Sequence, residues 1–196
     1  MQIFSSNTLK SKSLRRKVMF AAVALALAVP ATGSLAAGGN WFGSEEIKGS
    51  GVAKTQTRQT GPFTGFAMSV PGHAEVRIGA TEGITIEADD YLLPMIETVV
   101  EKGVLRVRPT RDNLSLRART LKIVVNAKSL DRLSLDGAGT ITTGALRADR
   151  LSLAVGGSGT INVGAAEADR VSVAVGGSGD INVRGGKANR LSVTIG

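Results

Sequence analysis

The sequence contains no cysteine and only one histidine, His73. The absence of cysteine excludes disulfide bonds, thiolate metal ligands, a thiol nucleophile and a lipid-modified cysteine. A single imidazole without an evident partner does not make a histidine metal cluster or a Ser-His-Asp triad. We therefore expect a protein that is not an enzyme, with no catalytic residue, no metal and no cofactor.

Aromatic residues are also scarce, and none follows Tyr91. Sugar rings and single-stranded bases are commonly bound by stacking on aromatic side chains. The second half of the chain therefore lacks the stacking platforms of such sites.

Acidic residues are absent before Glu45, whereas five basic residues lie among the first 17 positions. An apolar run at 18–29 and the small residues Ser34-Leu35-Ala36 follow them, which is the layout of a secretory signal peptide over 1–36. Without these five charges the formal net charge falls from +8 to +3, so a nucleic-acid partner is not indicated. The run is shorter than the ~20 residues of a membrane span, so no transmembrane helix is expected in the mature chain.

The predicted leader places the protein in the periplasm, at the outer membrane or on the cell surface. Residues 37–61 are rich in Gly, Ser, Thr and Gln, and we interpret them as a flexible linker before a domain at 62–196. Short runs of alternating apolar residues then predict β-strands. These runs are 76–78, 84–86, 104–107 and 121–125.

The last third of the sequence repeats every twenty residues. Gly137-Ala138-Gly139, Gly157-Ser158-Gly159 and Gly177-Ser178-Gly179 recur at this spacing, with alternating apolar strands between them. The expected role of Gly137, Gly139, Gly157, Gly159, Gly177 and Gly179 is to supply positive φ at sharp turns. Such a period predicts an all-β, right-handed β-helix-like solenoid with rungs of about 20 residues, preceded by irregular strands.

These repeats resemble the family of putative auto-transporter adhesins with a head GIN domain. The first half of the domain resembles the family too, at Phe63-Thr64-Gly65-Phe66 and at 88–93, 96–100 and 103–107. The resemblance implies an exported adhesin or structural module of the cell envelope, and it supplies no catalytic residues. The sequence also stops within a repeat at Gly196, so we expect either a fragment truncated at its C-terminus or a chain completed by another subunit.

Two interpretations of Asp149-Arg150, Asp169-Arg170 and Asn189-Arg190 stay open, because these pairs recur in register. Arg150, Arg170 and Arg190 could form a ladder that captures an anionic polysaccharide or a lipopolysaccharide phosphate. Alternatively, each Asp caps a turn and its charge offsets the stacked arginines.

The expected partners are envelope glycans or other surface proteins, and self-association through the solenoid ends is a further possibility. The alternative function is a glycan-binding protein or a carbohydrate-active β-helix enzyme that uses Asp136 and Asp180.

Overall fold

The computed structural model describes residues 45–48, 52–112, 114–117 and 120–196. Most of these residues lie in β-strands, and the 3-10 turn η1 (Leu93–Met95) is the only helical element among them. The all-β prediction is therefore confirmed. The predicted signal peptide lies outside the described residues. The strands are β1 (Glu45–Lys48), β2 (Ala53–Arg58), β3 (Gly65–Met68), β4 (His73–Ile78), β5 (Gly83–Asp89), β6 (Ile96–Glu101), β7 (Val104–Pro109), β8 (Leu114–Arg117), β9 (Leu121–Ala127), β10 (Arg132–Gly137), β11 (Thr140–Gly157), β12 (Thr160–Gly177), β13 (Asp180–Val183) and β14 (Gly186–Ile195).

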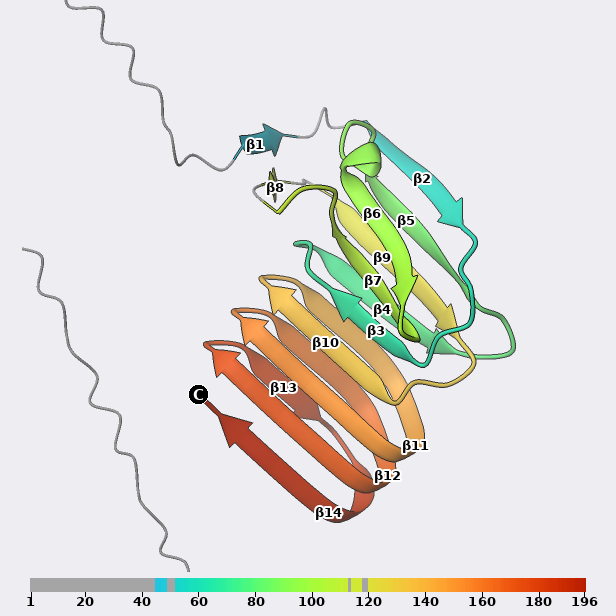
Figure 1. Ribbon diagram of the computed structural model, residues 1–196, viewed down its shortest axis with the longest axis vertical. Coiled ribbons are helices and arrows are strands. Elements are labelled where there is room, and N and C mark those ends of the chain that lie inside the picture. The colour runs from blue at the N-terminus through green and yellow to red at the C-terminus, as the bar shows by residue number, and fades with distance from the viewer. Residues whose placement is uncertain (1–44, 49–51, 113, 118–119) are drawn as a thin grey trace, which may run out of the picture. The chain divides into compact units, whose positions relative to one another are not determined.

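Twelve of these strands form one mixed sheet, and β1 pairs only with β8 (Figure 1). The strand order is β2-β5-β9-β4-β11-β10-β3-β7-β6, and β12 continues from β11 to β13 and β14. β2, which lies within the segment expected to be a linker, pairs with β5 over its whole length.

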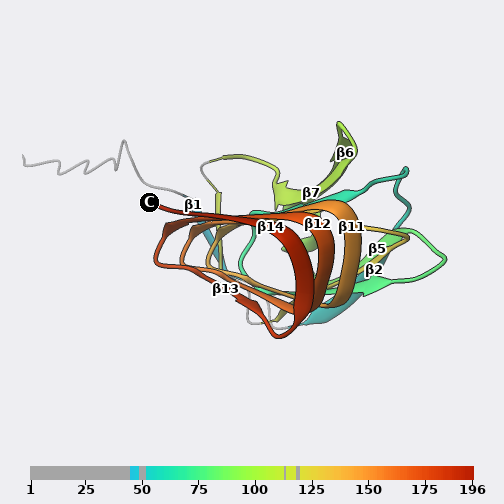
Figure 2. The same cartoon turned by 90° about the horizontal axis from the view of Figure 1, so that it is seen from below.

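The prediction of a right-handed β-helix-like solenoid is wrong. The sheet is mixed and curls into a nearly closed, barrel-like form, which Figure 2 shows end-on. Three strand pairs, β2–β5, β5–β9 and β6–β7, are antiparallel. Strands distant in sequence are also interleaved, because β3 lies between β7 and β10 and β4 lies between β9 and β11. The repeat covers only the last third of the chain, so the non-repeating strands of the first half determine the closure.

The twenty-residue spacing appears in the structure as the register of the parallel pairs. Leu151 lies opposite Val171, which in turn lies opposite Leu191. Because the offset is the same along β11 and β12, equivalent side chains form rows across the sheet. Adjacent members of a row are separated by the strand spacing of about 4.8 Å.

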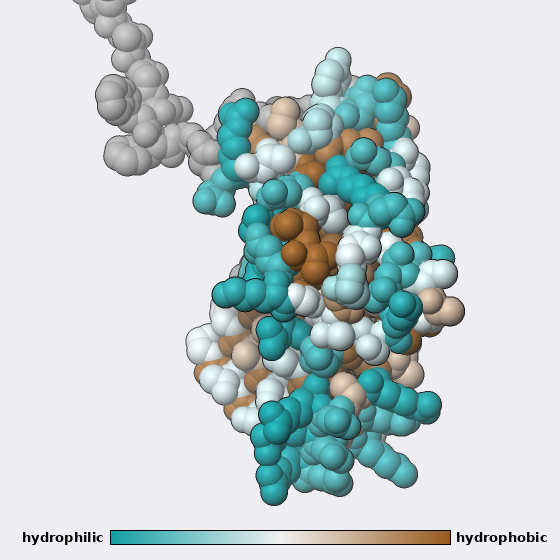
Figure 3. Space-filling view, turned by 45° about the vertical axis from the view of Figure 1, so that its right-hand side comes forward, coloured by the Kyte–Doolittle hydropathy of each residue, from teal (hydrophilic) through white to brown (hydrophobic). Residues whose placement is uncertain are grey.

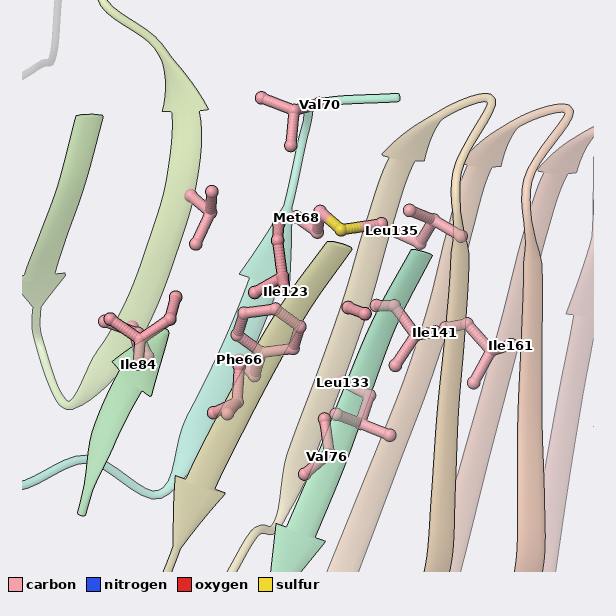
Figure 4. Close-up of a cluster of buried hydrophobic side chains, with 14 of the residues drawn as sticks. Phe66, Met68, Val70, Val76, Ile84, Ile123, Leu133, Leu135, Ile141 and Ile161 are labelled. Carbon is pink, nitrogen blue, oxygen red and sulfur yellow. The ribbon is translucent and has the colours of Figure 1, made fainter. Parts of the chain in front are cut away.

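The inward side of the sheet is filled by apolar side chains from both halves of the sequence. Phe66, Ile123, Leu133, Ile141 and Ile161 are all fully buried and lie along one continuous core (Figure 4). Burying this apolar surface is the main favourable contribution to folding.

Arg58 connects the two strands that lie at opposite ends of the sheet order. It extends from β2 and donates hydrogen bonds to the carbonyl oxygens of Leu93 (2.9 Å) and Ile96 (2.7 Å) and to Oγ1 of Thr98 (2.7 Å). Partial burial lowers the pKa of the Arg58 guanidinium from its ordinary value. Because β2 and β6 are at opposite ends of the strand order, these bonds help to close the sheet.

The two glycines of each repeated turn meet different requirements. Gly137, Gly157 and Gly177 have φ of +117°, +109° and +95°, which favour glycine. The second glycine has no positive φ, but it has no room for a side chain. A Cβ at Gly159 would lie 2.8 Å from the carbonyl oxygen of Gly139. Close backbone approach, and not the expected positive φ, therefore explains this second glycine.

Replacing Arg58 by Met should lower the free energy of unfolding by about 1–3 kcal/mol, because buried carbonyl groups lose a charged donor. Chemical denaturation measures this change. The matched control is Arg77→Met, which removes an exposed ion pair with Glu75 and should cost no more than about 1 kcal/mol. Equal losses in the two variants would contradict the role given to Arg58.

Gly159→Ala should destabilise the fold by about 1–3 kcal/mol, because the new methyl group overlaps the neighbouring backbone. Gly144 provides the control, since nothing lies within 4 Å of a Cβ built at that position and its φ is not positive. Gly144→Ala should be neutral or stabilising by about 0.4–1 kcal/mol. Thermal and denaturant unfolding of both variants would test this difference.

Candidate functional site

A bend in the long strands β11 and β12 creates the most polar surface of the repeat. Backbone pairing of β11 with β12 is continuous from Ala145 to Ala148 and resumes at Arg150, with an interruption at Asp149 and an earlier one at Gly144. Consecutive residues of a regular strand point to opposite faces. The interruption explains how Asp149 and Arg150 both come to line one groove.

Three rows of polar side chains cross the sheet at this bend. Row A consists of Arg147, Glu167 and Lys187, row B of Asp149, Asp169 and Asn189, and row C of Arg150, Arg170 and Arg190. Hydrophilic side chains gather at the bottom of the view in Figure 3, in the part of the molecule that β11, β12 and β14 form.

Row A alternates in charge along its length. Nε of Arg147 lies 2.8 Å from Oε2 of Glu167, and Lys187 follows Glu167 in register. In row B the amide of Asn189 donates a 3.1 Å hydrogen bond to Asp169. These two rows therefore contain contacts that stabilise the stacked strands.

Row C contains three positive charges in succession. Arg150 lies opposite Arg170, and Arg170 lies opposite Arg190. Within the described part of the chain, none of these three guanidinium groups forms an ion pair or a side-chain hydrogen bond. Like charges at this spacing repel by about 1 kcal/mol per pair in water, so the row has unused donors and an unfavourable self-interaction.

The groove along rows B and C has a volume of about 720 Å³. Asp131 lines it together with the members of those two rows. Asp131 was not among the predicted site residues. The sequence does contain a signal for it, because Asp131-Arg132-Leu133 repeats the pattern Asp149-Arg150-Leu151, at a spacing of 18 instead of 20.

The alternative interpretation of the Asp residues as turn caps finds no hydrogen bond to support it. Over the described residues, the side-chain carboxylates of Asp149 and Asp169 accept no hydrogen bond from a backbone amide of the bend. The carboxylate of Asp169 accepts its hydrogen bond from the side chain of Asn189. The carboxylates nevertheless lie beside row C in the groove, where they reduce its repulsion.

The structure does not bring together the two carboxylates of the enzyme alternative. Asp136 lies in the row of Gly156 and Gly176, whereas Asp180 lies in the row of Thr160, Thr140 and His73. His73 is exposed at the start of β4. Among the described residues, no cluster of three or more His, Asp or Glu side chains is arranged to hold a metal ion.

A match to a family model identifies the protein family of this chain. A family model described as "Putative auto-transporter adhesin, head GIN domain" matches residues 62–196. The chain belongs to this family. The resemblance identified from the sequence is thereby confirmed. None of the curated protein sequences matches the chain.

Several solved structures share the fold of this head GIN domain. A "Putative lipid binding protein" from Parabacteroides distasonis aligns with a TM-score of 0.71 at 20% identity, covering 77% of this chain and 65% of that one. The present chain therefore spans less than two thirds of that protein. A putative adhesin from the same organism gives 0.54 at 18% identity, covering 77% of this chain and 73% of that one.

A putative adhesin from Bacteroides fragilis gives a TM-score of 0.53 at 17% identity, covering 76% of this chain and 95% of that one. These identities show a common fold and no more. The family and these structures carry the names of adhesins or of a lipid-binding protein, and none is named as an enzyme. Among the described residues, no helix has the length and hydrophobicity of a membrane span.

Arg170→Ser removes the middle charge of row C and with it the repulsion from its two neighbours. This variant should leave the free energy of unfolding unchanged, or raise it by a few tenths of a kcal/mol at low salt. Glu167→Ser serves as the contrast, since it removes the partner of Arg147 and should cost about 0.2–1 kcal/mol. Denaturant unfolding at low and high salt measures both effects. A larger loss for Arg170→Ser than for Glu167→Ser would show that row C stabilises the fold.

Proposed function

We propose that this chain is an exported, non-catalytic interaction domain of the bacterial cell envelope. We further propose that the groove along rows B and C binds an anionic glycan. The family name and the predicted leader support the envelope location. The observation that supports the ligand class is row C itself, whose three stacked guanidinium groups have no partner among the described residues.

The chemistry of row C suits a repeating anion. A guanidinium group offers a planar set of donors that matches carboxylate, sulfate or phosphate oxygens in a bidentate manner. Arginines repeated at the strand spacing present this set several times along one line. A polymer with an anionic group on successive units can contact several of them at once, and each additional contact raises the apparent affinity.

The carboxylates of row B restrict which ligands fit. Asp131, Asp149 and Asp169 bring as many negative charges to the groove as row C brings positive ones. A groove without net charge does not attract every polyanion by long-range steering. We therefore expect ligands that combine anionic groups for row C with hydroxyl groups that donate hydrogen bonds to row B, as acidic sugars do.

Heparin chromatography provides the test, with heparin as a model acidic glycan. The Arg150→Gln/Arg170→Gln variant should elute at clearly lower salt than the unmodified chain, because it loses two of the three arginine contacts. The control is Lys54→Gln/Lys122→Gln, which removes the same charge from exposed positions outside the groove. It should elute close to the unmodified chain. Equal shifts in the two variants would indicate binding by net charge and would overturn the proposal.

A further inference from the structure

The groove along rows B and C holds as many negative charges as positive ones. Row C supplies three guanidinium groups, and three carboxylates line the same groove, those of Asp131, Asp149 and Asp169. The remaining lining residue, Asn189, is uncharged. At neutral pH the charges of the groove therefore sum to zero.

These opposite charges do not pair with each other. Within the described residues, no ion pair joins a member of row C to a carboxylate of the groove. In the neighbouring row A, by contrast, Arg147 and Glu167 are in contact at 2.8 Å. The carboxylate of Asp169 accepts one hydrogen bond, from Asn189, and over the same part of the chain the Asp149 carboxylate forms none. Both the donors and the acceptors of the groove are thus available to a ligand.

The carboxylates favour a ligand that carries positive charge as well as negative charge. A ligand with anionic groups alone pairs with row C but brings its own charge close to three carboxylates, which repel it. A hydroxyl group donates a hydrogen bond to a carboxylate without compensating its charge. An ammonium group does both, and its hydrogen bond is the stronger one because both partners are ionised.

We propose that the groove binds a zwitterionic glycan, whose anionic groups pair with row C and whose amino-sugar ammonium groups pair with the three carboxylates. This inference rests on the proposed function and adds the second charge of the ligand to it. The volume of about 720 Å³ is within the range of ligand sites. Because an Asp-Arg pair recurs on β11 and β12, a repeating ligand can make the same two contacts on adjacent strands.

Two heparin derivatives that differ in one group provide the test. N-desulfated heparin has free ammonium groups beside its carboxylates and O-sulfates, whereas N-desulfated, N-acetylated heparin has the same anions and uncharged acetamide groups. Oligosaccharides of equal length are titrated into the full chain at slightly acidic pH, where amino groups are protonated and Asp side chains are ionised. The ammonium form should bind at least about threefold more tightly, because several ammonium–carboxylate pairs add to the affinity.

Binding by net charge alone predicts the opposite order. The formal net charge of the chain is +8, and the acetylated derivative is the more negative of the two ligands. Long-range attraction would therefore favour the acetylated form. The sign of the difference thus identifies the contribution of the carboxylates.

Asp149→Asn/Asp169→Asn should abolish the preference for the ammonium form. This ligand loses two charge partners and should bind at least about threefold more weakly, whereas the acetylated form should bind more tightly because repulsion is removed. Opposite changes for the two ligands do not arise from loss of folding. The control Asp136→Asn/Asp180→Asn removes the same charge from exposed positions outside the groove and should retain the preference.

The possible results separate this inference from the proposed function. Equal affinities, tighter binding of the acetylated form, or a preference that survives in Asp149→Asn/Asp169→Asn would overturn the zwitterionic ligand. If Arg150→Gln/Arg170→Gln still weakens binding of both derivatives in these cases, anionic-glycan binding by row C stands. If the unmodified chain binds neither derivative, the proposed function fails together with the inference.

Discussion

Parallel backbone pairing at a constant offset of twenty residues is the constraint on which the polar surface of this chain depends. It places the paired residues of β11 beside their equivalents in β12 and then in β13 or β14. Equivalent side chains therefore form rows across the sheet. Each member of a row interacts favourably or unfavourably with its neighbour on the next strand. Leucine and valine rows fill the core, the row of Arg147 alternates in charge, and the row of Arg150 accumulates positive charge.

Several features of this architecture could be predicted from the sequence. Alternating apolar residues identified strands at 76–78, 84–86, 104–107 and 121–125, all of which lie within strands of the structure. The spacing of the glycine turns gave the register of the last strands. Period-two patterns and repeats are local signals, so they predict individual strands and the register between neighbouring repeats.

The closure of the sheet could not be predicted in the same way. It depends on antiparallel pairs such as β2 with β5, and on the bonds of Arg58 to Leu93 and Ile96. These are contacts between segments that carry no shared sequence pattern, and a composition rich in polar residues made 53–58 resemble a linker. The groove was found through its arginines, but the bend that gathers row B beside row C and Asp131 became visible only in three dimensions.

The interleaving of strands has a consequence for how the molecule folds. In an array of stacked repeats, each unit contacts only its neighbours and can unfold from one end. Here β3 requires both β7 and β10, and β4 requires both β9 and β11. The repeats thus complete a sheet that the first half of the chain has begun. Such distant pairings favour slow folding as a single cooperative unit, in which the last third of the chain has no independent stability.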